Sequence, residues 1–241
     1  MSKRKVIFWL YIVLLHLLIA VLVQRMGLIP RLIAKFSGTI VENTSLYNAL
    51  LPYHRRMDGS VPDGAIVFIG DSMVHALVTS AIADKTANYG IGGDTVAGLI
   101  DRLSIYESLA GARAIVVSIG VNDLWWRSND EIELLYRQLF SQLPQQVPVL
   151  ANAIFPVEEK FDFPDGTNDR INALNSAVAA VANEHDNVTF LDYSAEFTSD
   201  SAQLDPSLHI GDGLHLNTRG YQLWIDILRD NLRTVTSLQV E

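Results

Sequence analysis

The chain has 241 residues, of which 49% are hydrophobic and 19% are charged. This composition is typical of one globular domain, alone or with an appendage, and it excludes a chain that is mainly disordered. The absence of cysteine excludes a disulfide scaffold, a thiolate zinc site and a cysteine nucleophile, while a formal net charge of −9 argues against a nucleic-acid-binding protein, which needs a basic face.

The charge is divided unevenly along the chain. Residues 1–57 carry eight Lys or Arg and a single acid, Glu42, for a net charge of +7. The other 184 residues carry ten bases and 26 acids, for a net charge of −16. Such a division predicts two physically different parts.

The first part begins with a candidate membrane span. Residues 6–24 carry no formal charge and are apolar apart from His16 and Gln24. As a helix, this run would reach about 28 Å, close to the hydrocarbon thickness of a bilayer, about 30 Å. The basic residues at positions 3–5 are typical of a cytoplasmic flank. We therefore predict a signal anchor over residues 1–25 that crosses the membrane once, with its N-terminus inside.

Two other interpretations of this run fit less well. A cleavable signal peptide has a shorter apolar core and a small-residue cleavage site, whereas residues 21–25 read VLVQR. A buried core helix of this length is seldom apolar on all sides. Residues 26–60 are then predicted to form a tether, residues 61–235 a folded domain and residues 236–241 a tail. The predicted topology puts the domain on the extracytoplasmic side, the periplasm in a bacterium.

Beyond residue 60, short apolar runs alternate with helical stretches. Strands are expected at 65–69, 87–91, 114–119, 147–154 and 188–191, and helices at 73–85, 95–110, 129–143, 168–185 and 216–232. This alternation predicts an α/β fold, a three-layer, doubly wound parallel sheet with helices on both faces. Active sites of such sheets lie beyond the carboxyl ends of the strands.

The turns after the first two predicted strands contain residues that could take part in catalysis or ligand binding. Gly70-Asp71-Ser72 follows the first strand, where a serine can expose its hydroxyl above the sheet or simply cap a helix. Residues 90–95 (GIGGDT) follow the second, and their glycines let the backbone approach a ligand. The spacing matches neither a dinucleotide fingerprint nor a phosphate loop. A flexible turn with Asp94 as a helix cap is the plainer alternative.

Two further turns complete the set. Asn122 follows the third predicted strand, and its amide can donate to a developing oxyanion or merely form a turn. The segment Asp212-Gly213-Leu214-His215 precedes the last helix, so His215 can act as a general base oriented by Asp212. His209 is the nearest competitor for the base. Because the acids show no metal-ligand spacing, we predict no metal and no other cofactor.

The order of these four turns resembles the SGNH (GDSL-type) hydrolase family over residues 60–235, and segments 70–74 and 88–95 look most like its platelet-activating-factor acetylhydrolase-like branch. The resemblance implies a serine esterase without a metal. The implied roles are nucleophile for Ser72, base for His215, orienting acid for Asp212, and oxyanion donors for the Ser72 N–H, the Gly93 N–H and the Asn122 side chain. Met73 and Leu216 depart from the family pattern without touching this chemistry.

The implied reaction is hydrolysis of a carboxylic ester through an acyl-enzyme. Trp125, Trp126, Phe161 and Phe163 are candidate substrate-binding residues, although the tryptophans could equally pack against the following helix. The expected partner is a small ester, either lysophospholipid-like or short-acyl, or an acylated glycan. The alternatives are an O-acetyl esterase or acyltransferase acting on cell-envelope polysaccharide, and a catalytically silent binding module, against which the complete set of catalytic residues counts.

Overall fold

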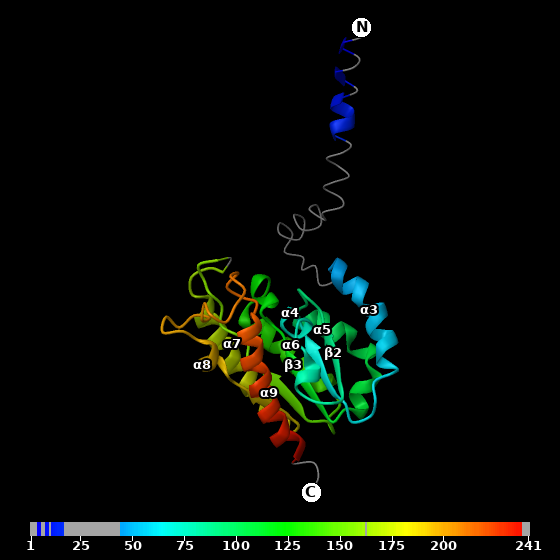
Figure 1. Cartoon of the computed structure of the whole chain (residues 1–241), viewed down its shortest axis with the longest axis vertical. Helices are drawn as coiled ribbons and strands as arrows, with labels where there is room; N and C mark the ends of the chain where they lie inside the picture. Colours follow the sequence, from blue (N-terminus) through cyan, green and yellow to red (C-terminus); the bar gives the residue numbers. More distant parts are fainter. Residues whose placement is uncertain (1–3, 6–7, 10, 17–43, 162, 238–241) are drawn as a thin grey trace. The chain divides into compact units, whose positions relative to one another are not determined.

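The computed structural model describes residues 4–5, 8–9, 11–16, 44–161 and 163–237, and the chain divides into two compact units, Met1–Val41 and Glu42–Glu241 (Figure 1). In the first unit, residues 11–16 are helical, and His16 Nδ1 donates to the Ile12 carbonyl at 2.7 Å. Most of the predicted span 6–24 lies outside the described residues. Within the described ranges, no helix combines the length and the apolar character needed to cross a membrane.

The second unit is built on a parallel sheet of five strands in the order β2-β1-β3-β4-β5. The strands are β1 Ile66–Gly70, β2 Thr86–Gly90, β3 Ala114–Ser118, β4 Val149–Asn152 and β5 Val188–Leu191. Every residue of β1, β3 and β4 is buried, as expected for strands covered on both faces. The predicted α/β sheet is confirmed, and each strand overlaps its predicted range.

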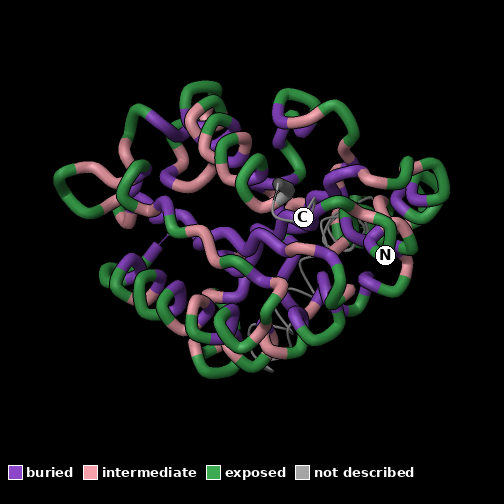
Figure 2. Tube along the Cα trace, turned by 90° about the horizontal axis from the view of Figure 1, so that it is seen from below, coloured by how far each residue is buried: buried purple, intermediate pink, exposed green. Residues whose placement is uncertain are grey.

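Helices cover both faces of the sheet. They are α3 Ser45–Asp58, α4 Ser72–His75, α5 Val96–Arg102, α6 Asn129–Gln142, α7 Thr167–Ala182, α8 Ser194–Phe197 and α9 Thr218–Ser237. Successive residues of β1 point to opposite faces, so Val67 and Ile69 pack in a core with α5, α6 and α7, whereas Ile66 and Phe68 pack in a second core with α4, α8 and α9. Figure 2 shows these buried strands running through the middle, between exposed outer segments.

Helix α3 occupies part of the segment predicted as a tether. Its N-cap is Thr44, whose hydroxyl accepts the Tyr47 N–H at 3.1 Å. Tyr47 is buried, and its hydroxyl donates to the Gly98 carbonyl at 3.1 Å. Residues 45–58 thus belong to the compact unit. The sequence does not reveal this, because the buried positions of α3 include polar residues rather than an apolar stripe.

Two other buried side chains of α3 are held by hydrogen bonds. His54 Nδ1 accepts the Tyr106 hydroxyl at 2.9 Å, and burial lowers the pKa of His54 to about 4, so the ring is neutral. Asp58 Oδ1 accepts the Tyr89 hydroxyl at 2.9 Å. These bonds satisfy polar groups that would otherwise be costly to bury.

Two helices are shorter than predicted. The range 73–85 contains only α4 and a 3₁₀ turn, Thr79–Ala81. Beyond the end of α4, the Asn88 amide donates to the carbonyls of Val74 and Leu77 at 2.7 and 2.9 Å, which satisfies acceptors that a longer helix would have used. The range 95–110 holds α5 and then two 3₁₀ turns, Leu103–Ile105 and Glu107–Gly111.

Candidate active site

The four turns singled out in the sequence gather around the carboxyl edge of the sheet. Strand β1 lies between β2 and β3, so the chain adds β2 on one side of β1 and then returns to add β3 on the other side. In α/β proteins, ligands bind where the strand order reverses in this way. Ser72 begins α4 directly after β1, and Asn122 begins a 3₁₀ turn, Asn122–Trp125, after β3. Gly93 lies in the turn after β2. His215 comes from the far end of the sequence, just before α9.

Ser72, His215 and Asp212 form a continuous hydrogen-bonded chain. Ser72 Oγ lies 3.1 Å from His215 Nε2, and His215 Nδ1 lies 2.6 Å from Asp212 Oδ2. The second oxygen of Asp212 accepts the backbone N–H groups of Leu214 and His215 at 3.0 and 2.9 Å. Because Asp212 accepts from Nδ1, Nε2 is left to accept the Ser72 hydroxyl proton.

The charge on Asp212 is stabilised locally. Burial opposes ionisation, but the hydrogen bonds from the His215 ring and from the two backbone N–H groups outweigh it and lower the pKa of Asp212. The Asp212 and His215 side chains are 39% and 40% exposed, so the pair faces solvent and can be reached by a substrate. An ionised Asp212 fixes the tautomer that a base at position 215 requires.

The three expected oxyanion donors lie on adjacent turns. Gly93 has φ +77°, a conformation that favours glycine. Asn122 Nδ2 donates one N–H to the Asp94 carbonyl at 2.8 Å, which fixes the amide and leaves its other N–H available. Within the described chain, the backbone N–H groups of Ser72 and Gly93 have no protein acceptor. All three therefore remain candidate donors to an oxygen bound beside Ser72.

A buried arginine that the sequence did not single out joins two of these turns. Arg102 Nε donates to Asp94 Oδ2 at 2.8 Å, and its terminal nitrogens donate to the Tyr89 and Gly70 carbonyls at 2.8 and 3.0 Å and to the Tyr106 hydroxyl. Burial raises the pKa of Asp94 to about 6, although Arg102 opposes the rise. Arg102 thereby links the end of β1 to the end of β2 and to the glycine turn.

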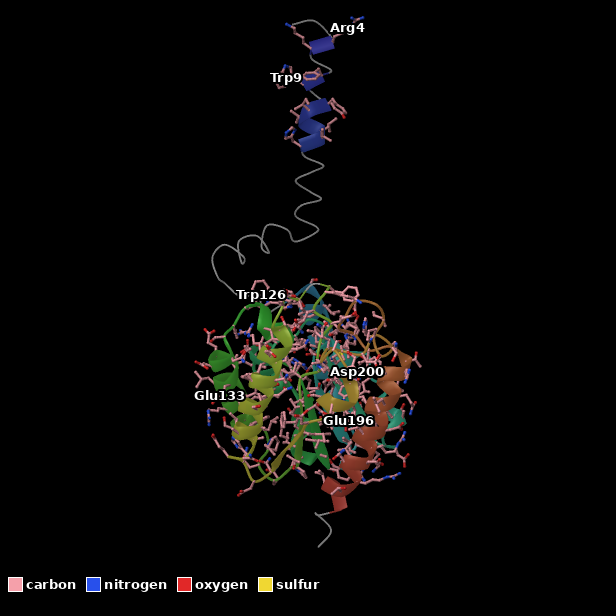
Figure 3. All side chains as sticks on the ribbon, turned by 90° about the vertical axis from the view of Figure 1, so that its left-hand side faces the viewer. Arg4, Trp9, Trp126, Glu133, Glu196 and Asp200 are labelled. Carbon is pink, nitrogen blue, oxygen red and sulfur yellow. The ribbon has the colours of Figure 1, made fainter. Side chains whose placement is uncertain are left out.

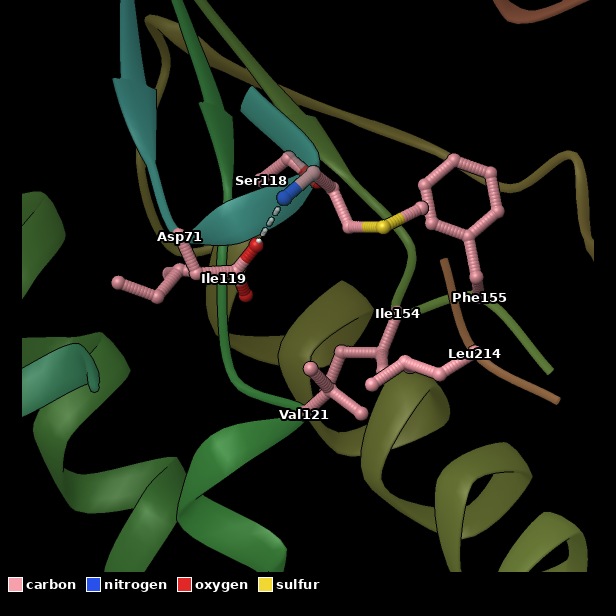
Figure 4. Close-up of a pocket in the computed structure, with 8 residues that line it drawn as sticks. Asp71, Ser118, Ile119, Val121, Ile154, Phe155 and Leu214 are labelled. Atoms are coloured by element: carbon pink, nitrogen blue, oxygen red, sulfur yellow. Dashed lines mark hydrogen bonds between the residues drawn. The ribbon is translucent and has the colours of Figure 1, made fainter. Parts of the chain in front are cut away.

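A small hollow lies beside the nucleophile turn. Its volume is about 10 Å³, and its lining includes Met73, Val121, Ile154, Phe155 and Leu214 (Figure 4). Asp71, at its edge, accepts the Met73 N–H at 3.0 Å, and burial raises the pKa of Asp71 to about 7. The lining therefore includes direct sequence neighbours of Ser72, Asn122 and His215.

The candidate substrate-binding residues lie in different environments. Trp125 and Trp126 are 47% and 48% exposed, and Figure 3 shows Trp126 at the outer edge of the unit. Phe163 is buried and packs against Trp125, with ring centroids 5.3 Å apart. Phe161 is 42% exposed and lies against the His209 ring. Contact between these four residues and a substrate stays a prediction.

Two more residues near the site were not expected from the sequence. A Cβ placed on Gly92 would lie 3.2 Å from Leu46 Cδ2 and 3.9 Å from the Ser72 Cβ, so α3 reaches the edge of the site. His75 Nδ1 accepts the Gly92 N–H at 3.2 Å. His209, the competing base, bonds to Glu158 instead of Ser72. His215 is therefore the histidine that contacts the serine.

The sequence also matches a known protein family. Residues 59–223 match the model of the GDSL-like lipase/acylhydrolase family, more than half of the chain. The chain belongs to this family. The predicted SGNH (GDSL-type) membership is confirmed, and the chain is a serine-type ester hydrolase of the acylhydrolase and esterase class.

Solved structures share the fold. A candidate platelet activating factor from Streptococcus pneumonia is 23% identical, with a TM-score of 0.72 over 87% of this chain and 98% of that one. A GDSL-like lipase from Bacteroides thetaiotaomicron is 16% identical, with a TM-score of 0.64 over 77% and 98%. An acetylxylan esterase from Geobacillus stearothermophilus is 20% identical, with a TM-score of 0.57 over 71% and 95%. No curated protein sequence matches the chain.

Proposed function

We propose that Ser72, His215 and Asp212 are the catalytic triad of an esterase that cleaves short-acyl or lysophospholipid-like carboxylic esters. The observation that carries the proposal is the unbroken chain from Ser72 Oγ through His215 to Asp212, with contacts of 3.1 and 2.6 Å. Nucleophile, base and orienting acid stand within hydrogen-bond reach of one another, as serine catalysis requires.

The mechanism follows from these contacts. Ser72 Oγ attacks the ester carbonyl carbon while His215 Nε2 takes the hydroxyl proton. Asp212 stabilises the resulting imidazolium. His215 then gives the proton to the leaving alcohol, which yields an acyl-Ser72. Water, deprotonated by His215, attacks this acyl group, and the carboxylic acid is released with Ser72 restored.

The negative oxygen formed in both steps needs donors. The N–H groups of Ser72 and Gly93 and the free amide N–H of Asn122 are proposed to bind it. Loss of one such donor typically lowers kcat by about 10²–10³-fold. Asn122 is well suited because its bond to the Asp94 carbonyl holds the amide in place before the substrate arrives.

The size of the hollow supports a short acyl group. The hollow of about 10 Å³ is lined by sequence neighbours of Ser72 and His215 rather than by these two residues, and we propose that it takes the acyl group, which would then have to be as short as acetyl. The alcohol part of the ester would remain outside the hollow, and exposed Trp125 and Trp126, at the end of the turn that begins at Asn122, are proposed to contact it. This separation predicts strict selection of the acyl group and weaker selection of the alcohol.

A second candidate is an O-acetyl esterase or acyltransferase acting on cell-envelope polysaccharide. The fold shared with an acetylxylan esterase favours it, and so does the small hollow. Both candidates use the same triad. They differ in the alcohol that leaves, and in whether water or a second alcohol accepts the acyl group.

The proposal includes attachment to a membrane. Residues 6–24 are proposed as a single-pass anchor that leaves the catalytic unit on the extracytoplasmic side, the periplasm in a bacterium. The support is the uncharged apolar run itself, preceded by three basic residues. An anchored enzyme would meet lipid esters and acylated envelope glycans at close range.

A fluorophosphonate probe tests the catalytic assignment on the full chain in detergent. We expect stoichiometric labelling of Ser72, none in Ser72→Ala, and unchanged labelling in Ser176→Ala, an exposed helical serine. Equal labelling of the Ser72→Ala variant, or no labelling of the natural chain, would contradict a serine esterase and favour a silent binding module. A p-nitrophenyl ester series from acetate to octanoate then measures acyl selection, and turnover of acetylated xylooligosaccharide far above all of these esters would favour the second candidate.

A further inference from the structure

The loop that carries Asp212 and His215 has an unusual internal support. Gly211 and Gly213 flank Asp212 with φ values of +100° and +74°, so the backbone reverses tightly on both sides of the acid. The loop is closed by the Ile210 N–H, which donates to the His215 carbonyl at 2.9 Å. The position of the acid relative to Ser72 therefore depends on what holds the two glycines.

A single nitrogen atom holds both. His209 Nδ1 accepts the Gly211 N–H at 3.0 Å and the Gly213 N–H at 3.1 Å. The ring is buried, with 6% of the residue exposed, so water does not substitute for it. Since Nδ1 accepts two N–H groups, it carries no proton, and the ring proton lies on Nε2.

Glu158 fixes that proton from the opposite side of the ring. Its Oε2 accepts from His209 Nε2 at 2.8 Å, while its Oε1 pairs with Lys160. The Glu158 N–H also donates to the Gly213 carbonyl at 2.8 Å. Burial raises the pKa of Glu158, but Lys160 and His209 outweigh burial and lower it, so the acceptor is a carboxylate.

We propose that His209, locked in its Nε2–H tautomer by Glu158, is a positioning residue that holds the 209–215 loop so that Asp212 and His215 face Ser72. The inference rests on the proposed function of that triad. His209 lies outside the Ser72–His215–Asp212 chain, and its ring is enclosed by Glu158, Phe161 and its own loop. Its loss should lower kcat and leave KM almost unchanged.

Two substitutions separate this role from simple packing. The asparagine of His209→Asn places an acceptor near the position of Nδ1, whereas the glutamine of His209→Gln reaches the position of Nε2 and offers the two glycines nothing. Glutamine is closer to histidine in volume. A packing role therefore predicts that Gln is better tolerated, and the positioning role predicts that Asn is.

The experiment measures kcat and KM of the full chain with p-nitrophenyl acetate, alongside thermal unfolding of each variant. We expect His209→Gln to lose about 10–100-fold in kcat with KM within about twofold, and His209→Asn to retain at least about a third of kcat. His185→Asn, a histidine packed on Phe140 in another part of the unit, is the matched control. Equal kcat for Asn and Gln, or a loss confined to KM, would overturn the inference.

Two further readouts make the result decisive. In the natural chain labelled with ¹⁵N-histidine, the His209 resonances should report a protonated Nε2 and an unprotonated Nδ1, and the opposite tautomer would overturn the inference even if no variant folds. The Ser72→Ala variant separates the two proposals. Full activity without Ser72 would remove the proposed triad, whereas an inactive Ser72→Ala beside fully active His209 variants would remove only the role of His209.

Discussion

A buried aspartate stands next to each of the three proposed oxyanion donors. Asp71 precedes Ser72, Asp94 follows Gly93, and Asp123 follows Asn122. Each carboxylate accepts a backbone N–H of its own or a neighbouring turn, from Met73, Thr95 and Val96 respectively. The turns are thus held by side chains that never need to touch the substrate. This arrangement buries three carboxyl groups close to one another, away from solvent, which costs free energy.

The free-energy cost of burying a carboxyl group should be measurable at Asp71. Burial raises its pKa from the ordinary 3.8 to about 7. Below about pH 4, Asp71 is protonated in both the folded and the unfolded chain and does not change the free energy of unfolding. Between about pH 4 and about pH 7 it ionises only in the unfolded chain, so the folded protein loses stability as the pH rises through this interval. Asp71→Asn keeps an acceptor for the Met73 N–H and removes the ionisation. We expect its free energy of unfolding to exceed that of the natural chain by up to about 4 kcal/mol above pH 7.

Urea unfolding between pH 4 and pH 8 checks this expectation, with exposed Asp186→Asn as the matched control. The difference between Asp71→Asn and the natural chain should widen over this interval. A difference that stays constant with pH would show that Asp71 does not titrate there.

At the scale of elements, α3 is the part of the fold that most changes the view of the site. It begins beside the glycine turn, where Leu46 approaches Gly92, and it is fastened along its length by Tyr47, His54 and Asp58. Part of the segment expected to be a tether is therefore a structural neighbour of Ser72. A change that weakens the packing of α3 should therefore also affect the glycine turn around Gly92.

The two tyrosines of α3 offer a matched test of its docking. Tyr47 is 3% exposed and donates to the Gly98 carbonyl, whereas Tyr53 is 57% exposed. We expect Tyr47→Phe to lower the free energy of unfolding by about 1 kcal/mol, because the Gly98 carbonyl loses a buried donor, and Tyr53→Phe to change it by less than about 0.5 kcal/mol. Denaturant unfolding of both variants measures the contrast, and equal effects would mean that α3 does not dock through Tyr47.

The elements that could be predicted are those whose side chains report their environment. The Ile and Val residues of 114–119 predict a strand, because such an apolar run is typical of burial on both faces. The predicted helix 129–143 agrees with α6 to within one residue at its C-terminal end. The sequence predicts neither the packing of α3 nor the burial of Arg102, because the groups that they bury are polar or charged. For His209, the sequence suggests only an alternative to His215 as the general base. Its bonds to two glycine N–H groups depend on the three-dimensional path of its own loop, which spacing alone does not show.

At the scale of the whole molecule, the uneven charge follows the two units. The acidic surplus lies in the part that folds around the sheet, and the basic surplus lies near the N-terminus. A net charge of this size keeps a domain soluble. It should also reduce its tendency to lie flat on an anionic bilayer, so that the proposed anchor, rather than the domain surface, would supply membrane attachment.

Alkaline carbonate extraction tests that division of roles. The full chain should stay with the membrane fraction, because a helix spanning the bilayer is not released by high pH, and a chain lacking residues 6–24 should appear in the supernatant. Protease added to sealed spheroplasts should cut the catalytic unit if it lies outside. Release of the full chain by carbonate would refute a spanning anchor, and protection of the unit would reverse the proposed side.

The distance along the chain between the two proposed catalytic partners has a consequence for biosynthesis. Ser72 and His215 are 143 positions apart, and α9, which follows His215, supplies fully buried Trp224 to the second core. A chain made or exported N-terminus first therefore presents its serine long before its histidine exists beside it. If Ser72 and His215 act together as proposed, we expect the chain to cleave no ester until α9 has packed against the second core.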